Sequence, residues 1–228
     1  MFQTEKALII IPARLKELKV DDCFSYEEKV EIYKSMLHDI AEYYVQKSRN
    51  TNVYVYFPDY ETCDFLIQVF PLRVKVFVHE GNENIYLESI SKALSDERKF
   101  VVLLEVSSFI YPIPWINNAY DVMTHKYDVV VTSIYRDNPN KLIGVKRLHE
   151  KFLSKIESET DELNILKFVD ALDVLFVPLK RIEYARDIES LKKVYAPILN
   201  DLKSDDFKRT RSAILNLFKK RKMVIFNG

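Results

Sequence analysis

Short apolar runs alternate with amphipathic helical stretches along most of the 228-residue chain. The run at 7–11, ALIII, is continuously apolar, as expected of a strand that is buried on both faces of a parallel sheet. Six further strands are predicted at 52–57, 74–78, 100–104, 127–133, 142–145 and 174–177. The run at 100–104 is the most apolar of all, which indicates a central position in the sheet.

The segments between these runs have the spacing of helices that lie on a sheet. Ser25 and Glu28 match a capping box, and an apolar stripe from Val30 to Tyr44 follows them. Asp205 and Asp206 are N-cap candidates for the last helix. Further helices are predicted at 61–69, 85–94, 149–157, 161–172, 187–195 and 205–222, with one more that opens at Pro112 and Pro114. The alternation predicts an α/β fold with three layers, in which a mixed, mainly parallel sheet of six or seven strands is flanked by helices.

The chain has three glycines, Gly81, Gly144 and Gly228. Phosphate-binding turns use glycine because a residue without Cβ lets the backbone approach a phosphate closely. Neither a G-x-G-x-x-G turn nor a G-x-x-x-x-G-K-[ST] loop can be built from these three positions. Side chains or ordinary backbone must therefore hold any nucleotide in the crevice beyond the carboxyl ends of the strands.

The composition is that of a globular protein, with 48% apolar residues. We expect one domain, with an α/β unit at 1–200 and a helical C-terminal extension of the same domain at 201–228. Lysine and arginine together number 34, as do aspartate and glutamate, so no general attraction to nucleic acid or anionic membrane is expected. The two cysteines form no C-x-x-C pair, the four histidines lack a spacing such as H-E-x-x-H, and no apolar run has the length of a membrane span. These features predict a cytoplasmic protein without a membrane span or a cysteine-rich zinc site.

The loop after the first predicted strand carries Arg14, Lys16 and Lys19. Such a loop lies beside the crevice of an open α/β sheet, where cations can bind phosphate by charge instead of through glycine backbone. Arg14 and Lys16 are therefore candidate phosphate- or nucleotide-binding residues. The alternative is a solvated loop in a lysine-rich protein.

Two acidic residues are candidates for catalysis and for metal binding. Glu105 follows the central strand, and Asp137 lies in the turn-rich stretch YRDNPN between two later strands. Either carboxylate would suit Mg²⁺ or Mn²⁺, which prefer oxygen ligands, or would serve as a base. Each has a structural alternative, because Glu105 also suits a capping or ion-paired role and Asp137 suits a turn that binds local backbone.

Several short motifs resemble those of one known family in their order and spacing. They are the strand at 9–12 followed by Lys16, the helix at 32–39, the strand at 101–109, the DVV run at 128–130 and the stretch 137–144. Over about 6–195 the chain thus resembles glycosyltransferase-A-like domains of unknown function, which are related to the nucleotide-diphospho-sugar transferases and, more distantly, to phospholactate guanylyltransferase. The resemblance implies a Rossmann-like fold of the transferase type and a nucleotide or nucleotide-sugar ligand. It also implies Mg²⁺ or Mn²⁺, held against a diphosphate by Glu105 or Asp137.

The chain also departs from the family's motifs. Leu18 stands at the position of an arginine, Ser107 stands near that of the central-strand aspartate, and only Asp137 survives of a D-G-G-Y element. Either Glu105 has taken over the metal, or metal-dependent transfer has been lost. Two hypotheses follow: a transferase that moves a glycosyl or nucleotidyl group from a nucleotide-activated donor, or a non-catalytic descendant that senses a ligand or binds a protein. A homo-oligomer is compatible with both.

Overall fold

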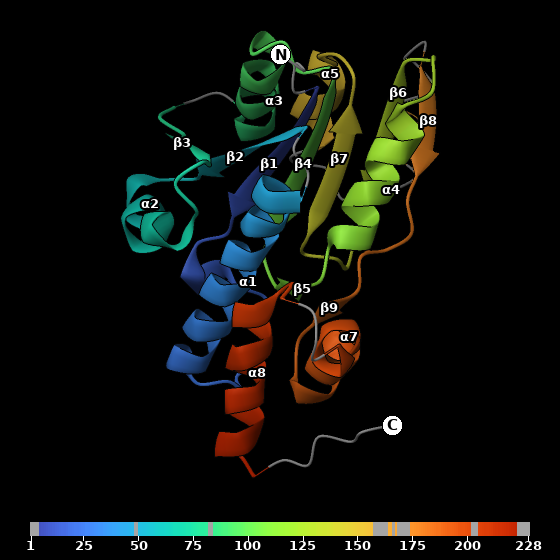
Figure 1. Cartoon of the computed structure of the whole chain (residues 1–228). Helices are drawn as coiled ribbons and strands as arrows, with labels where there is room; N and C mark the ends of the chain where they lie inside the picture. Colours follow the sequence, from blue (N-terminus) through green and yellow to red (C-terminus); the bar gives the residue numbers. More distant parts are fainter. Residues whose placement is uncertain are drawn as a thin grey trace.

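A computed structural model describes residues 5–47, 50–81, 84–156, 164–165, 167, 174–201 and 205–222. Seven strands form one sheet in the order β3-β2-β1-β4-β7-β6-β8 (Figure 1). The strands are β1 (Lys6–Pro12), β2 (Thr51–Phe57), β3 (Lys75–Val78), β4 (Phe100–Val106), β6 (Val129–Ser133), β7 (Lys141–Val145) and β8 (Leu175–Pro178). Only β7 among them is antiparallel to its neighbours, β4 and β6. The predicted mixed, mainly parallel sheet is confirmed, with β4 as its middle strand.

Helices cover both faces of the sheet, as predicted. They are α1 (Tyr26–Lys47), α2 (Tyr60–Leu66), α3 (Ile85–Ser95), α4 (Ile113–Met123), α5 (Glu150–Ile156), α7 (Ile188–Asn200) and α8 (Lys208–Lys220), with short 3-10 turns η1 (Leu15–Glu17) and η2 (Ile67–Val69). Because successive side chains of a strand point to opposite faces, Leu8 and Ile10 join a core with α1 and α4, whereas Ile9 and Ile11 join one with α3 and α5. Figure 1 shows these two helix layers on either side of the sheet. The predicted helix at 161–172 lies almost entirely outside the described residues.

The start of α1 has the predicted capping box. The Glu28 carboxylate accepts the Ser25 N–H at 2.8 Å, and the Ser25 hydroxyl accepts the Glu28 N–H at 3.3 Å. Glu28 also forms an ion pair with Arg221, which directly follows α8. This pair links the end of α8 to the start of α1.

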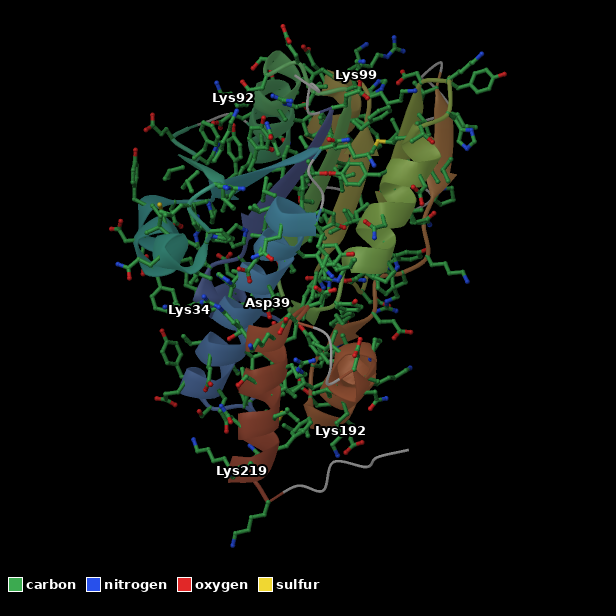
Figure 2. All side chains as sticks on the ribbon, viewed as in Figure 1. Lys34, Asp39, Lys92, Lys99, Lys192 and Lys219 are labelled. Carbon is green, nitrogen blue, oxygen red and sulfur yellow. The ribbon has the colours of Figure 1, made fainter. Side chains whose placement is uncertain are left out.

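The start of α8 differs from the prediction. Phe207, with a φ of 54°, occupies the N-cap position and provides no side-chain cap. The cap comes from α1 instead, because the buried Asp39 carboxylate accepts both the N–H and the hydroxyl of Thr210, each at 2.7 Å. Asp39 lies where α1 meets the start of α8 (Figure 2). The expectation that Asp205 or Asp206 caps this helix was therefore wrong, since these residues pair with Lys208 and Lys47.

A second, two-stranded antiparallel sheet joins β5 (Phe109–Ile110) to β9 (Tyr184–Ala185). No sequence pattern predicts it, because two residues are too few to show a strand period. The pairing brings the segment before α7 against the exit of β4. None of the described helices is long and apolar enough to span a membrane.

Candidate functional site

Strand directions bring several loops to one edge of the sheet. The carboxyl ends of β1, β2, β4 and β6 share this edge, and β7 begins there because it runs the other way. The loop after β1 contacts the exit of β4, where the Lys19 N–H donates to the Ser107 carbonyl at 2.8 Å. Ligands of open α/β sheets bind at this carboxyl edge.

Tyr33 of α1 holds the ends of β1 and β4 next to each other. Its hydroxyl accepts the Ala13 N–H at 2.9 Å and donates to the Val106 carbonyl at 2.8 Å. The side chain is fully buried, and this burial raises the pKa of the Tyr33 hydroxyl. The hydroxyl therefore acts as a neutral bridge between the two strand ends.

Asn140 occupies the backbone donors at the exit of β4. Its fully buried side-chain oxygen accepts the N–H groups of Ser107 at 2.9 Å and Ser108 at 3.2 Å. Its amide nitrogen donates to the Ser108 hydroxyl at 2.6 Å and to the Asn138 side chain at 3.2 Å. Neither of these two backbone N–H groups is left to bind a phosphate.

A cleft of about 180 Å³ opens at this edge, and Glu17, Tyr86, Glu105, Ser107 and Lys141 are among the residues that line it. The Tyr86 hydroxyl donates to Oε2 of Glu105. The Nζ atom of Lys141 lies 4.0 Å from the same oxygen and 5.5 Å from the centroid of the Tyr86 ring. Tyr86, Glu105 and Lys141 thus form one interacting cluster.

Sequence reasoning named Glu105 but missed Tyr86 and Lys141. Lys141 is the residue directly opposite Glu105 in the antiparallel pairing of β4 with β7. The sequence shows a lysine just before the apolar run at 142–145, but the direction of that strand decides at which edge the lysine lies. Tyr86 is in the first turn of α3, where the Asn84 side chain caps the helix.

Arg14 and Lys16 line a different, larger cavity of about 1010 Å³, which is bounded by the loop after β1 and by α2. The Arg14 guanidinium forms ion pairs with Asp59 and Glu17, so two carboxylates already balance its charge. Lys16 is exposed on η1. The structure therefore brings Arg14 and Lys16 together but places them on the other side of the loop from Glu105.

The pairing of Arg14 with Asp59 predicts a dependence of stability on pH. Desolvation raises the pKa of Asp59, but hydrogen bonds from Arg14 and Thr62 outweigh it and lower this pKa to about 2. In the unfolded chain the value is about 3.9. The contribution of Asp59 is therefore complete above about pH 4 and lost as the pH falls to about 2.

We expect Asp59→Asn to lose less stability than the wild type between pH 5 and pH 2.5. The losses in the free energy of unfolding of the variant and of the wild type should differ by about 1 kcal/mol. This difference is small because the Asp59 side chain is 30% exposed and solvent screens its pair with Arg14. Urea unfolding at the two pH values measures it. The control is Asp64→Asn. Asp64 is an exposed residue of α2, the helix that Asp59 caps, and this variant should show the pH dependence of the wild type. If the stability of the two variants depended on pH in the same way, Asp59 would not be a source of the pH dependence.

Asp137 lies in the turn between β6 and β7 and is exposed. Its backbone carbonyl accepts the Tyr184 hydroxyl at 2.9 Å. The hydrogen bond from Arg186 to Tyr184 is the main cause of the raised pKa of this arginine, and the Asp137 charge adds a small contribution. Asp137 is not among the residues that line either of the two cavities. The structure does not bring Asp137, Glu105 and Lys16 into one cavity.

Among the residues that the structure describes, the carboxylates of the cleft are not available to a divalent metal. Of the described residues that line it, Glu17 and Glu105 carry carboxylates, and each of them already faces a cation, Arg14 or Lys141. At phosphate sites Mg²⁺ is held by one or two carboxylates together with waters and the phosphates themselves, so a metal site requires carboxylates that are available to the ion. The donor set of the cleft therefore does not fit the metal that the family resemblance implies.

Within the part of the chain that the structure describes, one group of three potential metal ligands occurs, and it lies on α1. His38, Asp39 and Glu42 form this group, and each has a structural partner. His38 Nδ1 lies 2.5 Å from the Val69 carbonyl and Nε2 lies 3.2 Å from Glu42, while Asp39 caps α8. These contacts join α1 to η2 and α8.

Solved structures share this architecture over nearly the whole chain. A protein from Desulfovibrio desulfuricans G20, which carries the provisional name nucleotide-diphospho-sugar transferase, matches 98% of this chain over 100% of its own, with a TM-score of 0.72 and 16% identity. A cytidylyltransferase from Leptospira borgpetersenii serovar Hardjo-bovis matches 99% of this chain over 100% of its own, with a TM-score of 0.52 and 13% identity. The 4-diphosphocytidyl-2C-methyl-D-erythritol synthase from Anaerococcus prevotii DSM 20548 matches 86% over 99%, with a TM-score of 0.51 and 13% identity.

No protein-family model and no curated protein matches the sequence. At identities of 13–16%, the structural similarity concerns the fold. The order of the strands, the two helix layers and these matches lead to one conclusion: the chain has the fold of the nucleotide-diphospho-sugar transferases.

Proposed function

We propose that this protein is a transferase that binds a nucleotide or nucleotide-sugar at the carboxyl edge of the sheet and transfers its glycosyl or nucleotidyl group. The observation that carries the proposal is the cleft at this edge, in a fold that matches a protein provisionally named a nucleotide-diphospho-sugar transferase over that protein's full length. Open α/β sheets bind their ligands at this edge. The charged side chains of Glu105 and Lys141 give the cleft the polar groups that such a ligand requires.

Glu105 is the proposed base of the transfer. Its carboxylate lines the cleft and would accept the proton of the acceptor nucleophile, while the Tyr86 hydroxyl holds it in place. Lys16 is the proposed contact for the part of the ligand that extends beyond the cleft, because the loop that carries it separates the two cavities. Asp137 has no part in this arrangement.

The second candidate is a non-catalytic protein that binds the same ligand. Two observations favour it: the Ser107 and Ser108 N–H groups are occupied by Asn140, and the Glu105 carboxylate already has Tyr86 and Lys141 as partners. Both features suit a site that binds without turnover. Activity separates the two candidates.

A thermal-shift panel of CTP, UTP, GTP, ATP and UDP-glucose tests the proposal. At a ligand concentration of 100 Kd, binding adds about 2.7 kcal/mol to stability, which raises the Tm by several degrees. We expect at least one compound to do so, and Lys16→Ala to weaken its binding about threefold to tenfold. Lys19→Ala is the matched control, since Lys19 is on the same loop but is not among the residues that line the two cavities.

The outcomes are distinct. If no compound raises the Tm, the proposed function is contradicted. Binding with release of free nucleotide or pyrophosphate in the presence of acceptors supports the transferase. Binding without any product, detected by mass spectrometry, supports the non-catalytic candidate.

A further inference from the structure

We propose that the cleft holds the phosphate groups of its ligand through the Lys141 ammonium and without a divalent metal, an inference that rests on the proposed function. The position of Lys141 is the first step of the argument. It is the first residue of the antiparallel strand β7, so it lies at the edge where the parallel strands end. Its side chain is only 13% exposed and lines the cleft.

The second step is the charge around Glu105. The Lys141 ammonium lies 4.0 Å from Oε2, and the Tyr86 hydroxyl donates to this same oxygen. A metal bound at this oxygen would displace the Tyr86 proton and stand beside an ammonium of like charge. The other carboxylate of the cleft among the described residues, Glu17, is paired with Arg14.

The third step is the geometry of the ammonium itself. At 4.0 Å the contact with Glu105 is longer than a hydrogen bond, so Lys141 interacts with this carboxylate through charge and not through an N–H donor. Lysine binds phosphate as a point charge with three donors, as in phosphate-binding loops. Its position over the Tyr86 ring, 5.5 Å from the centroid, keeps the ammonium beside the cleft.

The size of the cleft limits the part of the ligand that it admits. A volume of about 180 Å³ is below the roughly 300 Å³ at which pockets for whole small molecules begin. The cleft therefore suits a phosphate or diphosphate group, while the nucleoside lies outside it. Lys141 then takes the role that a metal ion has in sites whose carboxylates are available to it.

Isothermal titration with inorganic pyrophosphate tests the inference, in a buffer with Mg²⁺ and in one with EDTA. The wild type should bind with the same Kd in both buffers, within about twofold. Lys141→Gln should weaken binding about 10- to 100-fold, as for the loss of a charge-assisted hydrogen bond, and Lys141→Arg should restore most of it. The matched control is Lys99→Gln, an exposed lysine at the opposite end of β4 (Figure 2), which should leave the Kd unchanged.

Glu105→Gln separates the two ways of binding by the direction of its effect. If Lys141 holds the anion, removing the neighbouring negative charge should strengthen pyrophosphate binding several-fold. If Glu105 holds a metal, the same change should abolish binding. Circular dichroism and the Tm of each variant show whether it folds, and Glu105→Gln serves as the test if Lys141→Gln does not fold.

Four results would overturn the inference: binding that requires Mg²⁺, binding that is indifferent to Lys141→Gln in a folded variant, loss of binding in a folded Glu105→Gln variant, and no pyrophosphate binding in either buffer. None of these outcomes depends on the result of the thermal-shift panel with nucleotides. The proposed function fails only if that panel shows no binding, so the two failures are distinguishable.

Discussion

Asn140→Ala is expected to lower the free energy of unfolding by about 3 kcal/mol. The substitution removes the side-chain oxygen that accepts the Ser107 and Ser108 N–H groups. The side chain is fully buried, so water cannot replace this acceptor without entering the core. Each buried N–H group that loses its partner costs about 1–3 kcal/mol.

Urea unfolding measures the effect, and two further variants serve as comparisons. Asn140→Asp keeps an acceptor for both N–H groups but loses the amide donations to Ser108 and Asn138 and buries a carboxyl group, so it should also lose stability. Asn118→Ala, at an exposed position of α4, should change the free energy of unfolding by less than about 0.5 kcal/mol. A loss below about 1 kcal/mol for Asn140→Ala would show that Asn140 does not organise the exit of β4.

Asp39→Ala is expected to cost about 2 kcal/mol, because it removes the cap of α8. The variant leaves the N–H of Thr210 without its acceptor in a buried place. Burial raises the pKa of the Asp39 carboxyl, so the charge itself is unfavourable in the folded protein. Asp39→Asn keeps an acceptor without that charge and should retain most of the stability.

The measurement is again the free energy of unfolding in urea, with Asp205→Asn as the control. Asp205 is exposed, and its ion pair with Lys208 is long at 3.7 Å, so this change should have little effect. If Asp205→Asn lowered the free energy of unfolding more than Asp39→Ala does, Asp205 would be the cap of α8, as the sequence indicated.

The layers of the fold were predictable because they depend on local patterns. The runs at 7–11 and 100–104 are apolar at every position, as expected of strands that are buried on both faces. The capping box of Ser25 and Glu28 spans four residues and was correct for the same reason. The apolar stripe of α1 has the helical period and is buried against the sheet.

The candidate site was predictable only in part. Glu105 was identified because it follows an apolar strand, and the structure places it in the cleft. Arg14 and Lys16 were assigned to the same cleft, but the turn η1 directs them to another cavity, and Asp59 and Glu17 neutralise Arg14. A loop sequence does not show on which side of the loop a side chain lies.

The amino-acid sequence alone was sufficient for the seven strands of the main sheet, most of the helices and the class of the sheet, since short-range periodicity encodes each of them. The tertiary structure alone decided that β7 runs antiparallel, which places Lys141 opposite Glu105, and that Asp39 caps a helix 171 positions away along the chain. Both depend on contacts between distant segments. Such contacts follow from how the whole core packs, and no local pattern of residues records them.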